Sequence, residues 1–266
     1  MSARAERAGP EKSAAFYNRI AHDYDVQMSG PDDTWIRSAF WDFVAARVPR
    51  EARVLDFGCG TGIDAAHYVE QGHQVLAYDN SARMIDTVRR RCAVEIAGGV
   101  VDAWSAPYEG FRESLRERPA FTVVTANFAA VNHLPDVDVW LDALAERAPG
   151  ECTVLVSSLN ACPLLDLRRR AFWRRALRGG HGHKEGLLFQ GEAYDHVRYW
   201  PWRLGRGSRT FRVVSRAGVG GLLGGNPGAR DWQRPRTIAE RLERAGWQTW
   251  PGWLAGRFTF VELRRR

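Results

Sequence analysis

Residues 54–62 read VLDFGCGTG, and the architecture of the chain is built outward from this stretch. An apolar run turns polar at Asp56, and glycines follow at 58, 60 and 62 before residues 63–71 take up helical spacing. Glycine is needed where the backbone takes positive φ or where a ligand approaches closely. The helix start behind the turn supplies free N–H groups. The stretch therefore predicts a strand, a tight turn and a helix, with a ligand site at Gly58 and Gly60.

The spacing of the glycines and of one acid indicates a nucleotide-type cofactor. A dinucleotide fingerprint has G-x-G-x-x-G followed by an acid about 20 residues later, whereas this chain has G-x-G-x-G. A second predicted strand, HQVLAYD, ends at Asp79, whose carboxylate can accept hydrogen bonds from both hydroxyls of a ribose. The order strand, helix, strand with these polar groups favours a Rossmann-like cofactor site.

The same stretch resembles motif I of the class I S-adenosylmethionine-dependent methyltransferases, which commonly reads V-L-D-x-G-C-G-T-G. The resemblance extends to FYNRIAHDYD (16–25), YDNSARMI (78–85), VVDAW (100–104) and FTVVTANFAAVNHLPD (121–136). It implies S-adenosyl-L-methionine as the cofactor. The alternative is a nucleotide-binding Rossmann domain of another kind.

Several residues are expected to contact that cofactor. In the resembled family an N-terminal leader folds over the cofactor, and Tyr17 and Tyr24 match its aromatic positions; the alternative is packing on the sheet edge. The Met84 position often lies against the adenine, and ordinary core packing is compatible with that role. Asp102 can accept from the adenine N6 amine, and Ala103 offers its N–H to N1. The full set of expected contacts is Tyr17, Tyr24, Asp56, Gly58, Cys59, Gly60, Asp79, Asn80, Met84, Asp102, Ala103 and Asn127.

The chain is expected to form one α/β domain over residues 1–266. Five short apolar runs separated by helical patterns predict a doubly wound, Rossmann-like parallel sheet. The third strand is expected to end at Asp102, with a polar loop over 105–120. The resemblance implies seven strands, mostly parallel, with an antiparallel last strand (258–263) beside strand five. Residues 1–50 are read as a helical cap, 163–208 as a lid inserted after strand five that carries acceptor specificity, and 236–245 as a helix.

His133, which follows the fourth predicted strand (121–125), is the candidate catalytic base. A hydroxyl or amine acceptor must lose a proton, and a base helps where its pKa and reach match. The alternative is a structural histidine that leads into the next helix. Other candidates lie in the lid: His181, His183 and His196 as bases, and Tyr194, Tyr199, Trp200 and Trp202 as an aromatic wall for a planar or prenyl-like acceptor or as the lid's own core.

Composition bounds the setting of the protein. The 266 residues carry a net charge of +7, and all but two of the 38 basic residues are arginine. Such a balance allows nucleic acid, anionic lipid or acidic partners, but a solvated arginine-rich surface is favoured, with at most weak peripheral membrane contact. No apolar run approaches the ~20 residues of a membrane span. Four scattered cysteines without C-x-x-C argue against a metal or a disulfide and for a reducing cytoplasm.

The resulting hypothesis is a cytoplasmic methyltransferase of small-molecule type, in secondary metabolism, with an aromatic or lipid-like acceptor. An RNA or protein methyltransferase is the second hypothesis, weakened because no RNA-binding module and no N-P-P-Y type motif are evident. A non-catalytic cofactor-binding subunit is the third. Acceptor identity, the methylated atom and the oligomeric state stay open.

Overall fold

The computed structural model describes residues 10–161, 182–189, 192–220 and 252–266. Its centre is a seven-stranded sheet in the order β3-β2-β1-β4-β5-β9-β8. The strands are β1 Arg53–Phe57, β2 Gln74–Asp79, β3 Val101–Ser105, β4 Val123–Ala126, β5 Thr153–Leu159, β8 Phe211–Val219 and β9 Phe258–Arg265. Strands β1 to β5 are parallel, and β9 runs antiparallel to both β5 and β8. The predicted fold class, with its antiparallel last strand, is confirmed.

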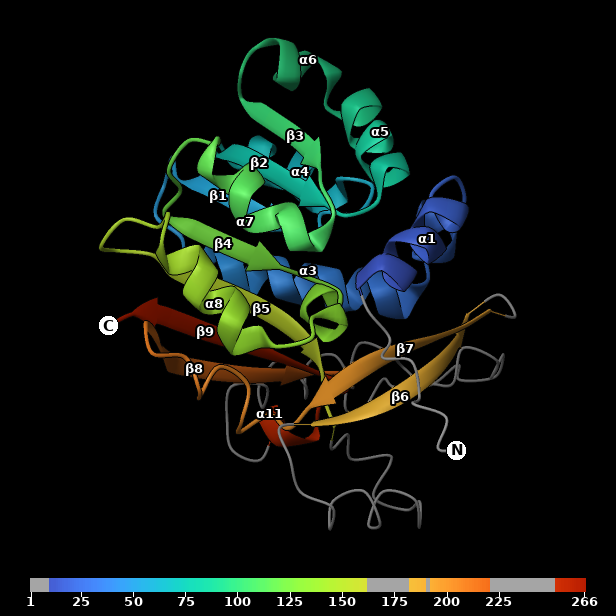
Figure 1. Cartoon of the computed structure of the whole chain (residues 1–266), viewed down its shortest axis with the longest axis vertical. Coiled ribbons are helices and arrows are strands. Elements are labelled where there is room, and N and C mark those ends of the chain that lie inside the picture. The colour runs from blue at the N-terminus through green and yellow to red at the C-terminus, as the bar shows by residue number, and fades with distance from the viewer. Residues whose placement is uncertain (1–9, 162–181, 190–191, 221–251) are drawn as a thin grey trace.

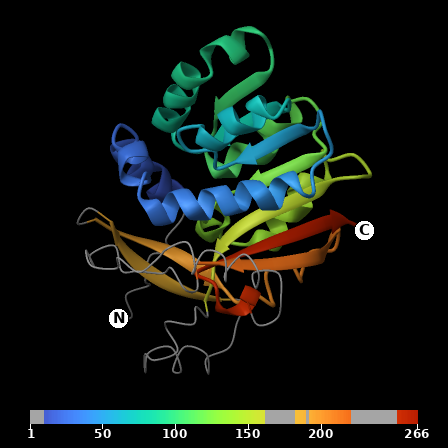
Figure 2. The same cartoon turned by 180° about the vertical axis from the view of Figure 1, so that it is seen from behind.

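Alternating side chains of the central strands supply two apolar layers. On β1, Val54 faces one core with α3 (Pro31–Ala45), α4 (Ile63–Glu70) and α5 (Ala82–Arg91), whereas Leu55 and Phe57 face the other core with α7 (Tyr108–Arg116) and α8 (Val137–Ala145). Figure 1 shows α7 and α8 over one face, and Figure 2 shows α3 running along the opposite face. A strand buried on both faces reads as a largely apolar run, and β4, VVTA, is buried at every residue.

Short elements complete the described chain. They are α1 Pro10–Ile20, α2 Tyr24–Gln27, α6 Ala93–Ala97, the 3₁₀ helix η1 Ala130–His133 and α11 Gly252–Ala255. Helix α1 lies beside α5 (Figure 1), and α1 and α2 together are called the cap below. No helix in the described ranges is long and apolar enough to cross a bilayer.

Two boundary predictions around the third strand are wrong. The strand runs to Ser105 instead of ending at Asp102, because it pairs with β2 as far as Asp79. The region expected to be a polar loop over 105–120 contains α7, which buries Phe111 and Leu115 against the sheet. The apolar side of this helix consists of few residues among many charged ones, and this hid it in the sequence.

The predicted lid begins with a β-hairpin in its described part. Strands β6 (Gly182–Phe189) and β7 (Glu192–Tyr199) pair antiparallel and form a separate two-stranded sheet. The hairpin joins the main body at the end of β7, where the Ala161 amide donates to the Tyr199 carbonyl at 2.9 Å. Tyr199, Trp200 and Leu204 are buried in the body. The expected helix at 236–245 and residues 163–181 of the lid lie outside the described residues.

Candidate active site

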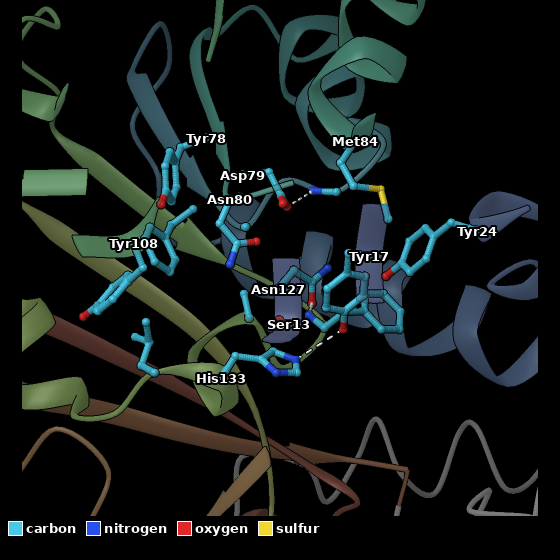
Figure 3. A pocket seen from close by; sticks show the side chains of 16 residues that line it. Ser13, Tyr17, Tyr24, Tyr78, Asp79, Asn80, Met84, Tyr108, Asn127 and His133 are labelled. Carbon is cyan, nitrogen blue, oxygen red and sulfur yellow. Dashed lines mark hydrogen bonds between the residues drawn. The ribbon is translucent and has the colours of Figure 1, made fainter. Parts of the chain in front are cut away.

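A cavity opens at the carboxyl edge of the parallel strands, between β1, β2, β4 and the cap (Figure 3), and encloses about 620 Å³ together with the part that is open to solvent. The carboxyl edge is where open α/β sheets bind ligands. The cavity is lined by Ser13, Tyr17, Tyr24, Phe57, Gly58, Gly60, Tyr78, Asp79, Asn80, Met84, Tyr108, Asn127, Phe128, Ala130, His133 and Leu134.

The glycine turn forms one wall of the cavity. Gly58 and Gly60 each require the absence of a side chain, but for different physical reasons. Both take left-handed backbone, with φ of 71° at Gly58 and 54° at Gly60. A Cβ on Gly58 would lie 2.6 Å from the Cβ of Ala130, so this glycine allows close packing on the η1 segment. A Cβ on Gly60 would have only Tyr24 within 4 Å, at 3.8 Å. Gly60 therefore leaves space open on the cavity side, as a bound cofactor requires.

Asp79 is held rigidly at the end of β2. The Gly60 N–H donates to Oδ2 at 3.0 Å and the Ser81 N–H donates to Oδ1 at 2.8 Å. The carboxyl group is buried, and burial raises its pKa to about 6 in spite of these two backbone hydrogen bonds. Because each carboxylate oxygen can accept a further bond, the group fits a vicinal diol such as the ribose of a nucleoside.

The cap supplies the opposite wall. The Tyr17 hydroxyl and His133 Nε2 share a hydrogen bond of 3.2 Å, and their rings meet edge to face at 5.6 Å (Figure 3). Tyr24 contacts Tyr17 edge to face, at 6.2 Å between ring centroids. Burial lowers the pKa of His133 to about 4, so its imidazole is neutral at neutral pH. The side of the cavity by His133 is thus aromatic, with one neutral proton acceptor.

Two polar side chains of the cap, Asn18 and Asp25, connect it to α5 and to the glycine turn. Asn18 Oδ1 accepts from the Ser81 hydroxyl at 2.8 Å and from the Arg83 N–H at 3.1 Å, at the start of α5. Asp25 accepts from the Thr61 hydroxyl in the glycine turn and from Arg91 at the end of α5. Tyr17 and Tyr24 are therefore placed over the cavity by contacts that neither tyrosine makes itself.

The wall that follows β4 takes an unusual backbone. Phe128 and Ala129 have φ of 44° and 65°, which residues other than glycine seldom adopt. Such strained positions cluster at ligand sites and persist where their surroundings hold them. Asn127 Oδ1 accepts from the Phe128 N–H at 2.8 Å, and the Ala129 N–H donates to the Ser157 carbonyl. The segment is thereby fixed against β5 and brings Phe128, Ala130 and His133 to the cavity.

Most of the predicted site residues meet at this cavity. Those that line it are Tyr17, Tyr24, Gly58, Gly60, Asp79, Asn80, Met84, Asn127 and His133. Sequence reasoning missed Ser13, Phe57, Tyr78, Tyr108, Phe128, Ala130 and Leu134. The sequence carried no signal for the strained turn at 128–129, and Tyr108 stood in a region read as a polar loop.

Four predicted residues lie outside the cavity lining. Asp56 is buried within β1 and accepts from the Thr125 hydroxyl at 3.2 Å, and the buried Cys59 thiol points to the Gly60 carbonyl. Because β3 continues to Ser105, Asp102 and Ala103 sit within the strand instead of at its end. Both oxygens of Asp102 accept from Arg118 at 3.0 Å.

The described lid candidates lie away from the cavity lining as well. His196 is buried, Tyr199 donates to the Leu134 carbonyl, and Trp200 stacks on the half-exposed Trp202 at 5.1 Å. These positions agree with packing of the hairpin base on the body. The side chains of His181, His183 and Tyr194 lie outside the described part of the chain.

A doubly wound sheet of this order, with a glycine turn and a buried acid at its carboxyl edge, defines a Rossmann-like nucleotide-cofactor protein. The model of the methyltransferase domain family matches residues 34–203. The chain belongs to that family, and it is a class I S-adenosylmethionine-dependent methyltransferase. The cavity fits this cofactor: Gly60 leaves room for it and Asp79 offers a fixed carboxylate for its ribose.

Known proteins of similar sequence and fold are methyltransferases. The chain is 28% identical over 183 residues to a ubiquinone biosynthesis O-methyltransferase of Xylella fastidiosa, covering 61% of this chain and 71% of that protein. It is 28% identical over 210 residues to a demethylmenaquinone methyltransferase of Beutenbergia cavernae, covering 74% and 79%. A solved 1,6-didemethyltoxoflavin-N1-methyltransferase of Burkholderia thailandensis shares the fold with a TM-score of 0.58 at 18% identity, covering 100% of this chain and 97% of that one.

Proposed function

We propose that this methyltransferase acts on a small molecule with an aromatic or lipid-like ring. The observation that carries the proposal is the cavity beside the cofactor-binding turn, whose walls are mostly aromatic or apolar (Figure 3). Tyr17, Tyr24, Tyr108 and Phe128 offer flat apolar surfaces. Among the described lining residues Asp79 has the one carboxyl group, and His133 is neutral at neutral pH. A planar, uncharged acceptor matches such walls better than a polyanion does.

The similar proteins support this acceptor class. Two of them are named for ubiquinone biosynthesis and for demethylmenaquinone. The free, buried thiols of Cys59, Cys92 and Cys152 support a reducing, cytoplasmic setting.

Each group of the chain has a proposed task. The cofactor, when bound, supplies an electrophilic methyl group on its sulfonium. Asp79 and the glycine turn hold the nucleoside part, and Tyr17 and His133 face the acceptor. In this structure His133 Nε2 shares a hydrogen bond of 3.2 Å with the Tyr17 hydroxyl. We propose that the substrate's hydroxyl or amine group replaces the Tyr17 hydroxyl there, and that neutral Nε2 then takes the proton of that group. Alignment of the acceptor with the methyl group and exclusion of water contribute the rest of the rate. The insertion at 163–208 is proposed as a lid that selects the acceptor.

An acceptor screen tests the function directly. Purified protein with methyl-labelled S-adenosylmethionine is offered catechols, hydroquinones with and without a prenyl chain, amino sugars and bulk tRNA. We expect label in a phenolic or quinol product. Asp79→Ala, run in parallel below saturating cofactor, should lower the amount of label because it binds the cofactor more weakly. Transfer to tRNA alone, falling steeply with salt, would replace the proposal by the RNA reading. Cofactor binding without transfer to any acceptor would favour a non-catalytic subunit.

A further inference from the structure

A buried polar cluster adjoins the cavity, and its members Arg37, Trp41 and Asp64 do not line the cavity. Its centre is Asp64 on the first turn of α4, whose Oδ1 accepts from Arg37 at 2.7 Å and from the Trp41 indole N–H at 2.8 Å. Its Oδ2 accepts from the Asn127 amide at 3.0 Å. Side-chain exposure is 10% for Arg37 and 7% for Asp64. Three elements distant in sequence, α3, α4 and the end of β4, are thus joined at one carboxylate.

The cluster ends on the strained wall of the cavity. Asn127 uses its amide N–H for Asp64 and its Oδ1 for the Phe128 N–H, so the side chain is fixed at both ends. The Arg37 guanidinium lies 4.4 Å over the Phe128 ring, the residue with φ of 44°. A cation over an aromatic face is attractive when it is desolvated. Arg37 therefore holds the strained turn twice, through Asp64 and Asn127 and through the Phe128 ring.

A strained backbone needs such support. Each residue held in a sparsely populated φ,ψ region costs on the order of 1–3 kcal/mol, and the surroundings must over-determine it. If the support is lost, residues 127–133 relax toward other conformations. The apparent affinity for a ligand then falls by the fraction of molecules that keep the binding conformation.

We propose that Arg37 and Asp64 are positioning residues, which hold the turn at Phe128 and Ala129 in the conformation that binds the cofactor. They act through Asn127 and Phe128, which line the cavity, and touch no ligand themselves. This role is separate from the identity of the acceptor, so it does not depend on the proposed small-molecule activity.

The chain offers a closely matched control just beyond the same helix. Arg47 follows the end of α3, has 12% side-chain exposure, pairs with the buried carboxylate of Glu262 at 3.0 Å, and lies 3.8 Å over the Phe43 ring. Glu262 is on β9 and does not line the cavity. Arg47→Met therefore breaks the same kind of buried ion pair and ring contact without touching the wall after β4.

The test measures binding of S-adenosylhomocysteine by calorimetry and amide hydrogen exchange of peptides covering residues 127–133. We expect Arg37→Met and Asp64→Asn to weaken binding about tenfold, the factor that roughly 1.4 kcal/mol of relaxed strain gives. Both variants should speed exchange in that segment. Arg37→Lys, whose ammonium can still reach Asp64, should recover most of the affinity, and Arg47→Met should bind like the wild type while losing thermal stability.

Clear results would overturn the proposal. Folded Arg37→Met with wild-type affinity and exchange would remove Arg37 from this role. Equal weakening by Arg47→Met would show that Arg37 acts only through general stability. If Arg37→Met does not fold, Asp64→Asn decides, because it keeps the side-chain shape but presents an N–H either to Asn127 or to Arg37 and Trp41. Unchanged binding by that variant would contradict the proposal.

Discussion

Asp79 combines burial with a proposed binding role, and we therefore expect cofactor affinity to depend on pH. Burial raises the pKa of its carboxyl to about 6, so the group holds a proton below that pH and is ionised above it. Ribose hydroxyls donate to the ionised form. The affinity for the cofactor should therefore be at its maximum near pH 7.5 and about tenfold lower at pH 5, as proton linkage requires.

Calorimetry with S-adenosylhomocysteine between pH 5 and 7.5 measures this effect. Asp79→Asn is the control. It should bind more weakly by about 1–3 kcal/mol, because it loses hydrogen bonds to a charged group. The affinity of this variant should not change between pH 5 and pH 7.5. Wild-type affinity that is constant from pH 5 to 7.5 would show that Asp79 is either outside the binding site or already ionised at pH 5.

His133 carries a second pH prediction at the residue scale. An unperturbed histidine titrates near ~6.5, but burial lowers the pKa of this one to about 4. With saturating cofactor, kcat should thus stay flat through pH 6.5 and fall only near pH 4. His133→Ala should slow turnover roughly 10²–10⁴-fold, the usual contribution of a general base, with cofactor affinity nearly unchanged.

A companion variant separates catalysis by His133 from packing. Tyr17→Phe removes the partner of His133 Nε2 but keeps the ring contacts, so it should leave most of the turnover. A His133→Ala enzyme with wild-type kcat and a lower melting temperature would assign the histidine a structural role.

At the scale of elements, the sequence predicted those helix starts and turns that depend on neighbouring residues. The turn with Gly58 and Gly60, the cap of α5 by Ser81 and the start of α3 at Pro31 all follow from nearby residues, and each was predictable. The end of β3 was not, because Asp102 continues the strand through pairing with β2 and finds Arg118 as its ion-pair partner. Such outcomes depend on tertiary contacts, which a polar side chain in the sequence does not reveal.

The candidate site divides in the same way. Cavity residues that belong to a motif could be found from the sequence, as Asp79 and Gly60 were. Phe128 and Tyr108 could not, because one is placed by a strained turn that Asn127 and Arg37 support and the other by a helix with few apolar residues. The Arg37–Asp64 pair is separated by 27 positions in the chain and is visible only in three dimensions.

The contacts of the cap lead to a prediction about the rate at which the cofactor product dissociates. Asn18 and Asp25 fasten α1 and α2 to α5 and to the glycine turn. Replacing both by Ala removes hydrogen bonds worth on the order of 1 kcal/mol each. The dissociation rate of S-adenosylhomocysteine, followed by stopped-flow fluorescence, should rise about tenfold.

An exposed carboxylate on α5 provides the matched control for this cap variant. Asp86 pairs with Arg89 on the same helix, away from the cap, and exposed pairs of this kind contribute little. Asp86→Ala should leave the dissociation rate unchanged. An unaltered rate in the Asn18→Ala, Asp25→Ala protein would show that the cap does not limit cofactor release.

In the molecule as a whole, the residues that line the cavity and the hairpin β6–β7 belong to different parts of the chain. The cavity lining in the described chain comes from the cap, the sheet edge and α7, all before residue 135. The hairpin β6–β7 is a sheet of its own, attached where Ala161 and Asn132 donate to Tyr199 and Val197 (Figure 1). These attachment points, and the buried Tyr199, Trp200 and Leu204, belong to the folded body. A deletion that spares them can test the lid without removing the core.

The lid is tested by a shortened protein in which a Gly-Ser linker replaces residues 163–195. We expect this protein to bind S-adenosylhomocysteine like the wild type. It should lose methyl transfer to the acceptor found by the screen. A few flexible residues can span the gap, because Ala161 and Tyr199 are already joined by a hydrogen bond of 2.9 Å. Gln190→Asn, which keeps a two-residue connection between Phe189 and Glu192, is the control and should retain transfer. Loss of cofactor binding in the shortened protein would mean that the insertion supports the cavity itself. Full transfer would place acceptor selection outside it, at the wall formed by Tyr17, Tyr108 and His133.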